Sequence, residues 1–309
     1  MLALLLGCAL DFLLGEPRRA HPLVAFGKYA KRFEGFLHPG VADPLLTRAC
    51  GVLALCMAVA PFVVLAVCMG TWFGNSVVAS IFDAVLLYFA LGARSLGEHA
   101  RAIATPLTAG DLDGARAALA RIVSRDTHGL DSSGVAAASI ESVLENGNDA
   151  IFGALFWFAL LGGPGALMFR LANTLDAMWG YRTARYLHFG WAAARFDDIL
   201  NYLPARITAL SYALLGHCRQ ALHCWRRQAP VWSSPNAGPV MASGAGSLGL
   251  QLGGSACYHG EWEERPPLGC GVRPAASDIG RAIRLVRHTQ WLWIVVMLLT
   301  FYARKVWHE

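Results

Sequence analysis

Long apolar runs alternate along the chain with short clusters of charged and amide side chains. No charged residue occurs in residues 49–82, and the apolar pattern continues beyond Asp83. A helix needs ~20 apolar residues to cross the core of a bilayer. We therefore predict membrane helices at about residues 50–69 and 77–91, joined by a short loop at residues 70–76.

Two further apolar runs are less regular. The run at residues 150–169 is interrupted by Gly-Gly-Pro-Gly at residues 162–165, which a straight helix would not contain. The run at residues 290–303, QWLWIVVMLLTFYA, is rich in Trp but short for a membrane helix. The N-terminal MLALLLGCAL lacks the basic start and the cleavage pattern of a signal peptide, so we expect an uncleaved, partly buried helix ending near Asp11.

Composition agrees with a membrane protein. The chain is 55% hydrophobic and 15% charged, whereas soluble domains carry about 25% charged residues. Basic residues precede the first predicted span and follow the second, and the loop between the spans has none, which places both flanks in the cytoplasm. The net charge of +5 is scattered, and no nucleic-acid-binding module is recognisable, so no nucleic-acid partner is expected.

The predicted fold class is all-α, a polytopic integral membrane helical protein with a large cytoplasmic helical and loop region. We expect one membrane-embedded domain over residues 1–309. Its segments are N-terminal helices with a basic loop and a membrane hairpin (1–91), a cytoplasmic helical segment (92–149), a broken apolar segment with motif helices (150–217), a cytoplasmic Gly/Ser-rich loop region (218–289) and a C-terminal membrane helix (290–309).

The first polar cluster is IESVLENGND, residues 140–149. On a helix, Glu141, Glu145 and Asn148 or Asp149 would share one face. A solvated side of a helix would explain this pattern. The position directly before the apolar run at Ala150 favours instead a rim of carboxylates at a cavity near the membrane.

The second and third clusters lie on either side of residue 185. In NTLD, Asn173 and Asp176 are three residues apart, and Thr174 is a candidate N-cap, so an ordinary helix start would also explain them. The segment ARFDDILNYLPAR contains Arg195, Asp197, Asp198, Asn201 and Arg206. Adjacent aspartates on a helix point about 100° apart, so one can bind a metal while the other pairs with an arginine. A salt-bridge network could explain this segment alone.

The fourth cluster is SSPNAGPVMASGAGSLGLQLGG, residues 233–254. It contains neither a Walker motif nor a dinucleotide-binding fingerprint. Its small residues would allow close helix packing, or the backbone amides of SPNAG would cradle a phosphate. Both interpretations stay open.

Five blocks in chain order carry a family resemblance: LDFLLGEPRRAHPLVAFGK, ESVLEN, GGPGALMFRLANTLDAMWGYRTARYLHFGWAAARFDDILNYLPARITAL, SPNAG and LGLQLGGSACYHG. Together they resemble the CobD/CbiB family, the adenosylcobinamide-phosphate synthases of cobalamin biosynthesis. The resemblance implies an inner-membrane ligase that joins the carboxylate of adenosylcobyric acid to the amine of aminopropanol phosphate, or of threonine phosphate, with ATP and Mg²⁺ at the cytoplasmic side. A homo-oligomer, or a complex with other membrane proteins of the pathway, stays open.

The reaction implied by the resemblance assigns roles to the polar clusters. Mg²⁺ needs hard oxygen ligands, and the candidates are Glu141, Glu145, Asp197 and Asp198. Arg195 and Arg206 would neutralise phosphate charge. Asp149 or Asp176 would accept the proton of the amine, and Asn173 would donate to the oxyanion. The expected substrate-binding residues are Asp11, His21, Asn146, Tyr181, Asn201, Arg206, Ser234, Asn236, Gly238 and Tyr258. A turn role would also explain His21, because Pro22 follows it.

Two other classes are compatible with parts of the pattern. Membrane prenyltransferases also place Asn and Asp on helices around Mg²⁺, but they tend to repeat an Asn-Asp-x-x-Asp pattern, which neither ENGND nor NTLD has. A non-catalytic membrane relative of the family would be expected to lack the combined NTLD, ARFDD and SPNAG blocks, all of which are present.

Overall fold

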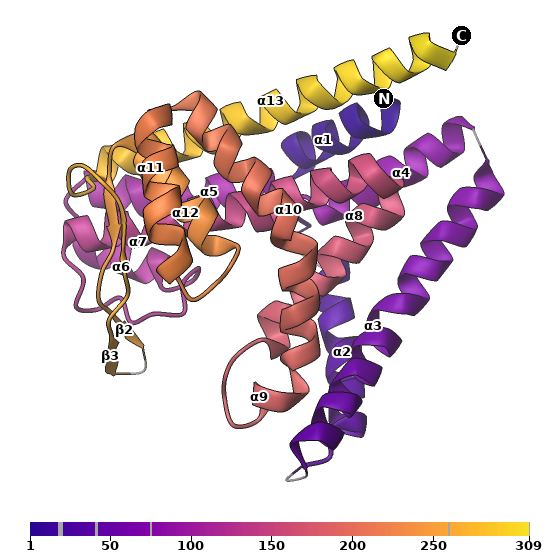
Figure 1. Cartoon of the computed structure of the whole chain (residues 1–309), viewed down its shortest axis with the longest axis horizontal. Helices are drawn as coiled ribbons and strands as arrows, with labels where there is room; N and C mark the ends of the chain where they lie inside the picture. Colours follow the sequence, from indigo (N-terminus) through magenta and orange to yellow (C-terminus); the bar gives the residue numbers. More distant parts are fainter. Residues whose placement is uncertain (18–20, 41–42, 75, 259, 309) are drawn as a thin grey trace. The chain divides into compact units, whose positions relative to one another are not determined.

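The structure is a computed structural model that describes residues 1–17, 21–40, 43–74, 76–258 and 260–308 (Figure 1). Helices make up most of it, which confirms the all-α prediction. In chain order the elements are α1 (Leu2–Leu14), α2 (Pro22–Leu37), α3 (Pro44–Phe73), α4 (Val77–Ala90), α5 (Ala93–Thr108), α6 (Leu112–Leu119), α7 (Ser132–Gly147), the π-helix η1 (Asn148–Phe152), α8 (Gly153–Trp179), α9 (Tyr186–Phe189), α10 (Trp191–Leu215), α11 (Cys218–Gln228), the 3-10 helix η2 (Ala229–Val231), α12 (Ala237–Leu248), β1 (Gln251–Gly253), β2 (Ala256–Tyr258), β3 (Glu261–Glu263), β4 (Pro267–Gly269) and α13 (Ala276–His308).

In the described part of the chain, four helical stretches are long and apolar enough to cross a membrane. They are Pro44–Phe73, Val77–Thr108, Ser132–Trp179 and Ala276–Trp307. The protein is therefore a polytopic helical membrane protein, as predicted. The first two stretches contain the spans expected at residues 50–69 and 77–91.

The C-terminal helix is longer than the apolar run from which it was predicted. α13 starts at Ala276, 14 residues before the run at residues 290–303. Near its start, the Asp278 carboxylate accepts the N–H of Ala275 at 2.8 Å and pairs with Arg281 at 2.7 Å. Since these charged residues continue the helix outside the apolar run, hydropathy alone gave too late a beginning.

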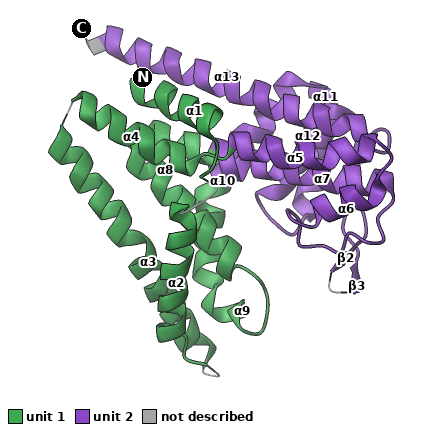
Figure 2. Ribbon diagram, turned by 180° about the vertical axis from the view of Figure 1, so that it is seen from behind, with its two compact units in different colours: residues 1–92, 153–201 green, residues 93–152, 202–309 purple. Residues whose placement is uncertain are grey.

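The chain forms two compact units, each assembled from two stretches (Figure 2). Unit 1 contains residues 1–92 and 153–201, and unit 2 contains residues 93–152 and 202–309. The chain passes from one unit to the other between α4 and α5, between η1 and α8, and within α10.

Unit 1 is built on a core shared by α2, α3, α8 and α9. Phe26, Leu55, Leu175, Trp179 and Phe189 are buried together there. The core includes one buried acid, Glu34, whose carboxylate accepts hydrogen bonds from Trp179 Nε1 at 3.2 Å, Arg185 Nε at 2.8 Å and Tyr186 Oη at 3.0 Å. Glu34 thus ties α2 to the end of α8 and to α9.

The helix α8 is broken where the sequence predicted. Gly162 has φ 68° and ψ −157°, a conformation that a residue with a side chain rarely adopts. The next residue begins a new helical stretch, and the N–H of Gly163 donates to Asp83 Oδ1 of α4 at 3.1 Å. Asp83 therefore acts as an N-cap supplied by another helix, which gives this carboxylate within an apolar segment a structural purpose.

Unit 2 is centred on α12, in which every residue from Ala237 to Leu248 is buried. A Cβ at Gly244 would lie 2.7 Å from a methyl carbon of Leu144, and one at Gly246 would lie 2.8 Å from the Cα of Ala221. The small residues of this segment therefore permit close packing of α12 on α7 and α11, one of the two interpretations left open above.

The segment 218–289, expected as a Gly/Ser-rich loop region, contains α11, α12, part of α13 and four short strands. β1 pairs antiparallel with β4, with Gln251 opposite Gly269, and β2 pairs antiparallel with β3, with Ala256 opposite Glu263. The expectation was wrong because the Gly and Ser residues of α12 serve helix packing rather than turns.

Candidate functional site

The predicted site residues are divided between the two units. Those in unit 1 are Asp11, His21, Asn173, Asp176, Tyr181, Arg195, Asp197, Asp198 and Asn201. Those in unit 2 are Glu141, Glu145, Asn146, Asp149, Arg206, Ser234, Asn236, Gly238 and Tyr258. Each unit is described by itself.

Unit 1 holds a carboxylate–amide cluster, formed by Asn173 and Asp176 of α8 with Asp197, Asp198 and Asn201 of α10. Asp197 is buried, and its two oxygens accept hydrogen bonds from Asn173 Nδ2 at 3.4 Å and from Asn201 Nδ2 at 3.0 Å. Asn201 follows Asp197 by one helical turn, so α10 itself provides the shorter bond. These bonds from two side-chain amides fix the orientation of the carboxylate.

The neighbouring Asp198 has different surroundings. Its Oδ2 lies 3.4 Å from Arg195 Nη1, and the Arg195 side chain is 60% exposed. Burial raises the pKa of Asp198, and this effect outweighs the lowering by Arg195 and Arg182. Asp176 of α8 lies within electrostatic range of Asp198. Adjacent aspartates thus meet different partners, as the helical geometry predicted, and two like charges come together at Asp176 and Asp198.

Thr174 does not cap a helix. It lies inside α8, and its Oγ1 donates to the carbonyl oxygen of Arg170, one turn earlier, at 2.7 Å. The interpretation of NTLD as a helix start was wrong, because the break in this helix occurs at Gly162 instead. Asn173 and Asp176 therefore project from a continuous helix, which fixes the positions of their side chains.

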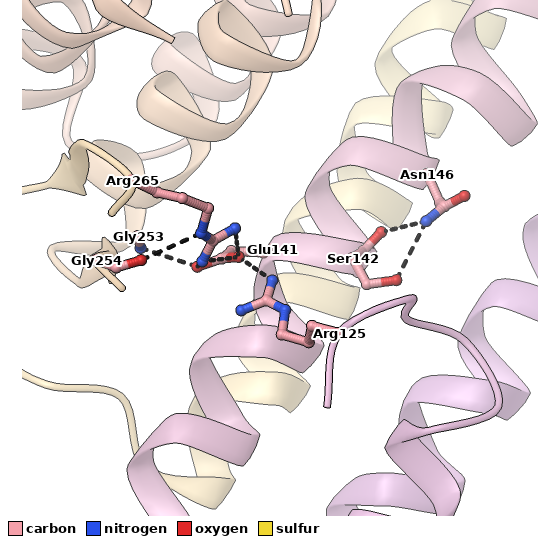
Figure 3. Close-up of polar contacts among 7 residues, drawn as sticks. All are labelled: Arg125, Glu141, Ser142, Asn146, Gly253, Gly254 and Arg265. Atoms are coloured by element: carbon pink, nitrogen blue, oxygen red, sulfur yellow. Dashed lines mark hydrogen bonds and ion pairs between the residues drawn. The ribbon is translucent and has the colours of Figure 1, made fainter. Parts of the chain in front are cut away.

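Unit 2 holds an arginine–carboxylate cluster around Glu141 of α7 (Figure 3). Glu141 is 2% exposed. It accepts hydrogen bonds from Arg125, from Arg265 at 3.2 Å and from the N–H of Gly253 at 2.8 Å. Sequence reasoning missed both arginines, which lie 16 residues before and 124 residues after Glu141. No local spacing connects residues so far apart.

The side chains in the rest of the ESVLENGND segment have several different partners. Asn146 Nδ2 donates back to the carbonyl oxygen of Ser142 at 2.9 Å (Figure 3). At Asn148 the backbone becomes π-helical, which alters the spacing that had placed Asp149 one turn after Glu145. Asn148 accepts from Thr208 Oγ1 at 3.1 Å and donates to Asp149 Oδ1 at 2.9 Å. π-helical turns are frequent at functional sites.

The SPNAG segment meets Arg206 in unit 2. Arg206 donates to Asn236 Oδ1 at 2.9 Å and to the carbonyl oxygen of Pro235 at 3.0 Å, and its guanidinium carbon lies 3.5 Å from the centroid of the Tyr202 ring. Ser234 Oγ accepts the N–H of Ala237 at 3.1 Å, at the beginning of α12. Arg206, expected to neutralise phosphate charge, and Asn236, expected to bind substrate, thus bind one another.

Glycine at position 238 is required by close packing. A Cβ there would lie 2.9 Å from the Cβ of Trp232 and 3.0 Å from the carbonyl oxygen of Ala229. Gly238 therefore allows η2 and the chain after it to approach α12.

Four predicted site residues remain, two from the start of the chain and two from later segments. His21 is the N-cap of α2, where Nδ1 accepts the N–H of Leu23 at 3.1 Å, which is the turn role considered above. Asp11 is buried within α1. Tyr181 is 54% exposed directly after α8, and Tyr258 is half-buried at the end of β2.

Among the described residues, no group of three or more His, Cys, Asp and Glu side chains gathers as a metal site would. Mg²⁺ in nucleotide-dependent enzymes, however, is held by one or two carboxylates, with waters and phosphate oxygens completing its shell. Asp176 and Asp198 fit this requirement as two carboxylates within electrostatic range of one another, with Arg195 already beside Asp198. Glu141 fits it less well, because a cation would compete with two guanidinium groups.

Comparison with known proteins connects the chain to one family. The model of the family described as CobD/Cbib protein matches residues 4–286. Curated relatives named "Cobalamin biosynthesis protein CobD" include those of Chromobacterium violaceum, 58% identical over 94% of this chain and 93% of the relative, and Stutzerimonas stutzeri, 57% identical over 94% of each. The protein of that name from Mycobacterium tuberculosis is 38% identical over 97% of this chain and 96% of its own length.

No solved structure matches the chain. The agreement in sequence covers both units and each of the polar clusters described above. The chain therefore belongs to the CobD/CbiB family of cobalamin biosynthesis proteins.

Proposed function

We propose that this membrane protein is the amide-forming ligase that joins the carboxylate of adenosylcobyric acid to the amine of aminopropanol phosphate or threonine phosphate. The reaction would consume ATP and require Mg²⁺, and it would take place at the cytoplasmic side of the inner membrane. Family membership supports the pathway. The observation that carries the chemistry is the carboxylate–amide cluster of unit 1, where Asp197 is buried and oriented by two amides beside the carboxylate pair Asp176 and Asp198.

The reaction needs negative charge at a defined place. A carboxylate does not react with an amine until one of its oxygens becomes a leaving group, and phosphoryl transfer from ATP would achieve this. Asp176 and Asp198 are the residues that would hold Mg²⁺, which would neutralise phosphate charge during that transfer. Exposed Arg195 is close enough to Asp198 to contact a phosphate oxygen of the bound nucleotide or of the amino-alcohol phosphate.

Asp197 suits the amine. Phosphate esters of amino alcohols carry an ammonium group at neutral pH, and this group must lose a proton before its nitrogen attacks. Asp197 would attract the ammonium group and accept its proton as the general base. Asn173 and Asn201 would hold the accepting oxygens in place throughout.

The direct test uses the whole chain purified in detergent. Adenosylcobyric acid, aminopropanol phosphate and Mg²⁺ are incubated with the protein, with and without ATP, and the corrinoid is followed by mass spectrometry. We expect a mass gain equal to amide formation only when ATP is present. Corrinoid binding without product would contradict the ligase and favour a carrier, and neither binding nor product would return attention to Mg²⁺-dependent prenyl transfer.

A further inference from the structure

The helix α11 presents an unusual basic face in unit 2. Arg219, His223, Arg226 and Arg227 recur at the spacing of one side of a helix, and all four are exposed. With Leu222 they line a surface hollow of about 430 Å³. The helix contains no acidic residue.

These arginines differ from others of the same unit. Arg116, Arg125, Arg265, Arg273 and Arg281 each form an ion pair with a carboxylate. Within the described ranges of the chain, no ion pair involves an arginine of α11. The mutual repulsion of these like charges would therefore be relieved by an anion from outside the chain.

The opposite side of α11 is fixed to the protein. Gln228 exchanges two hydrogen bonds with the backbone of Gly269, through Nε2 at 2.8 Å and Oε1 at 2.7 Å. Gln220 donates to the carbonyl oxygen of Cys270, and the Sγ atoms of Cys224 and Cys270 lie 3.2 Å apart. Since Ala221 and Cys224 are buried, α11 is held with its basic face outward.

The chain directly before α11 is apolar on its surface. In the part of α10 that belongs to unit 2, Leu203, Ile207, Leu210 and Leu214 follow one another at helical spacing and are 57%, 40%, 45% and 62% exposed. An exposed apolar stripe that leads into a basic helix is the pattern of a segment at a membrane surface, with its apolar residues toward the acyl chains and its basic residues toward anionic headgroups.

We propose that the basic face of α11 (Arg219, His223, Arg226 and Arg227) binds the phosphate groups of anionic phospholipids, and that the apolar stripe of α10 lies against the adjoining acyl chains. This contact anchors unit 2 to the membrane surface independently of the ligase chemistry. The apolar stripe of α10 favours lipid over free phosphate, because a small soluble anion would leave this stripe exposed to water.

The test is lipid binding by the whole detergent-purified chain, followed by native mass spectrometry. Phosphatidylglycerol is compared with phosphatidylcholine of the same acyl chains. We expect the wild type to prefer phosphatidylglycerol, and the triple variant Arg219→Gln, Arg226→Gln, Arg227→Gln to bind it about 100-fold more weakly, the order expected when three basic residues near an anionic surface are removed.

Two matched control variants distinguish loss of the α11 site from a general loss of positive charge and from misfolding. Lys28→Gln, Lys31→Gln and Arg32→Gln together remove the same charge from exposed positions on α2 and should leave phosphatidylglycerol binding unchanged. Arg219→Lys, Arg226→Lys and Arg227→Lys together keep the charge and should retain most of the binding, which also controls for misfolding.

Three outcomes would overturn the proposal. One is an equal loss in the α2 variant, which would mean a general effect of net charge. Another is no loss in the α11 variant. The third is binding of inorganic phosphate or glycerol phosphate, in the same measurement, as strong as that of phosphatidylglycerol and equally reduced in the α11 variant, because the site would then take a soluble phosphate.

Discussion

Glu141 in unit 2 and Asp197 in unit 1 are both buried carboxylates, 2% and 9% exposed, and the hydrogen bonds described for them come from different kinds of donor. Glu141 accepts from two guanidinium groups and one backbone N–H. Asp197 accepts from the side-chain amides of Asn173 and Asn201. Guanidinium groups neutralise a carboxylate, whereas amides only orient it. Equal burial thus serves two ends: joining distant segments of chain at Glu141, and fixing the orientation of a carboxylate at Asp197.

The largest effect on stability should come from Glu141→Gln. The variant leaves Arg125 and Arg265, whose side chains are each 11% exposed, without their counter-charge. Removing one partner of a buried ion pair costs about 3–5 kcal/mol, and we expect the free energy of unfolding in detergent to fall by that order. The matched control is Glu98→Gln, since Glu98 is 50% exposed in its pair with Arg94, and it should cost less than about 1 kcal/mol. Equal costs would mean that the buried Glu141 cluster contributes no more to stability than an exposed ion pair.

Asp197→Asn should have the opposite profile to Glu141→Gln, with a small loss of stability and a large loss of activity. The substitution keeps the shape of the side chain, but one of its atoms becomes a donor facing an amide donor, which costs about 1 kcal/mol of stability. If Asp197 binds the amine, kcat/KM for amide formation should fall about 100-fold or more. The exposed Asp113→Asn is the control and should leave activity unchanged. Wild-type activity in the Asp197 variant would exclude this residue from the mechanism.

A third carboxylate, Asp83, accepts from a backbone N–H, that of Gly163, and so adds a third kind of donor to the two compared above. Gly163→Ala would place a Cβ 2.6 Å from Asp83 Oδ1 and 2.9 Å from the Asp83 Cα. Overpacking of this kind costs about 1–3 kcal/mol, measurable as a lower free energy of unfolding. Gly35→Ala is the matched control on α2, where a Cβ would meet nothing within 4 Å, and it should stabilise the protein slightly. Stabilisation by both substitutions would mean that the N-cap contact is not close in solution.

The smallest effect should come from Arg195→Gln. This residue pairs with Asp198 at 3.4 Å but is 60% exposed, so solvent screens the pair and the loss of stability should stay below about 1 kcal/mol. Arg125→Gln, the same substitution in the arginine–carboxylate cluster, should cost several times more because Arg125 is buried with Glu141. Unfolding midpoints of the two variants in one detergent make the comparison, and similar values would contradict it.

The features that could be predicted from the sequence are mainly those that the bilayer imposes on the chain. Membrane thickness fixes the length and polarity of a spanning helix, so α3, α4 and the break at Gly162 could be recognised from local composition. The pairing of Asp197 with Asn201 follows from one helical turn. The partners of Glu141, Glu34 and Asp83 could not be found in this way, because each bond closes over many residues of intervening chain. The start of α13 was missed because its first residues include charged side chains, which lower the local hydropathy but are compatible with a helix.

The capping of α8 by Asp83 also has a consequence for the order in which the protein is made. Synthesis delivers α4, with its carboxylate, before the ribosome reaches the glycine pair that interrupts α8. The freed N–H of Gly163 therefore finds its acceptor already placed when it enters the membrane, and no lipid-exposed backbone donor has to wait for a later segment. A permuted chain that carried α4 after α8 would lose this advantage, because the second half of the broken helix would be inserted before its cap existed.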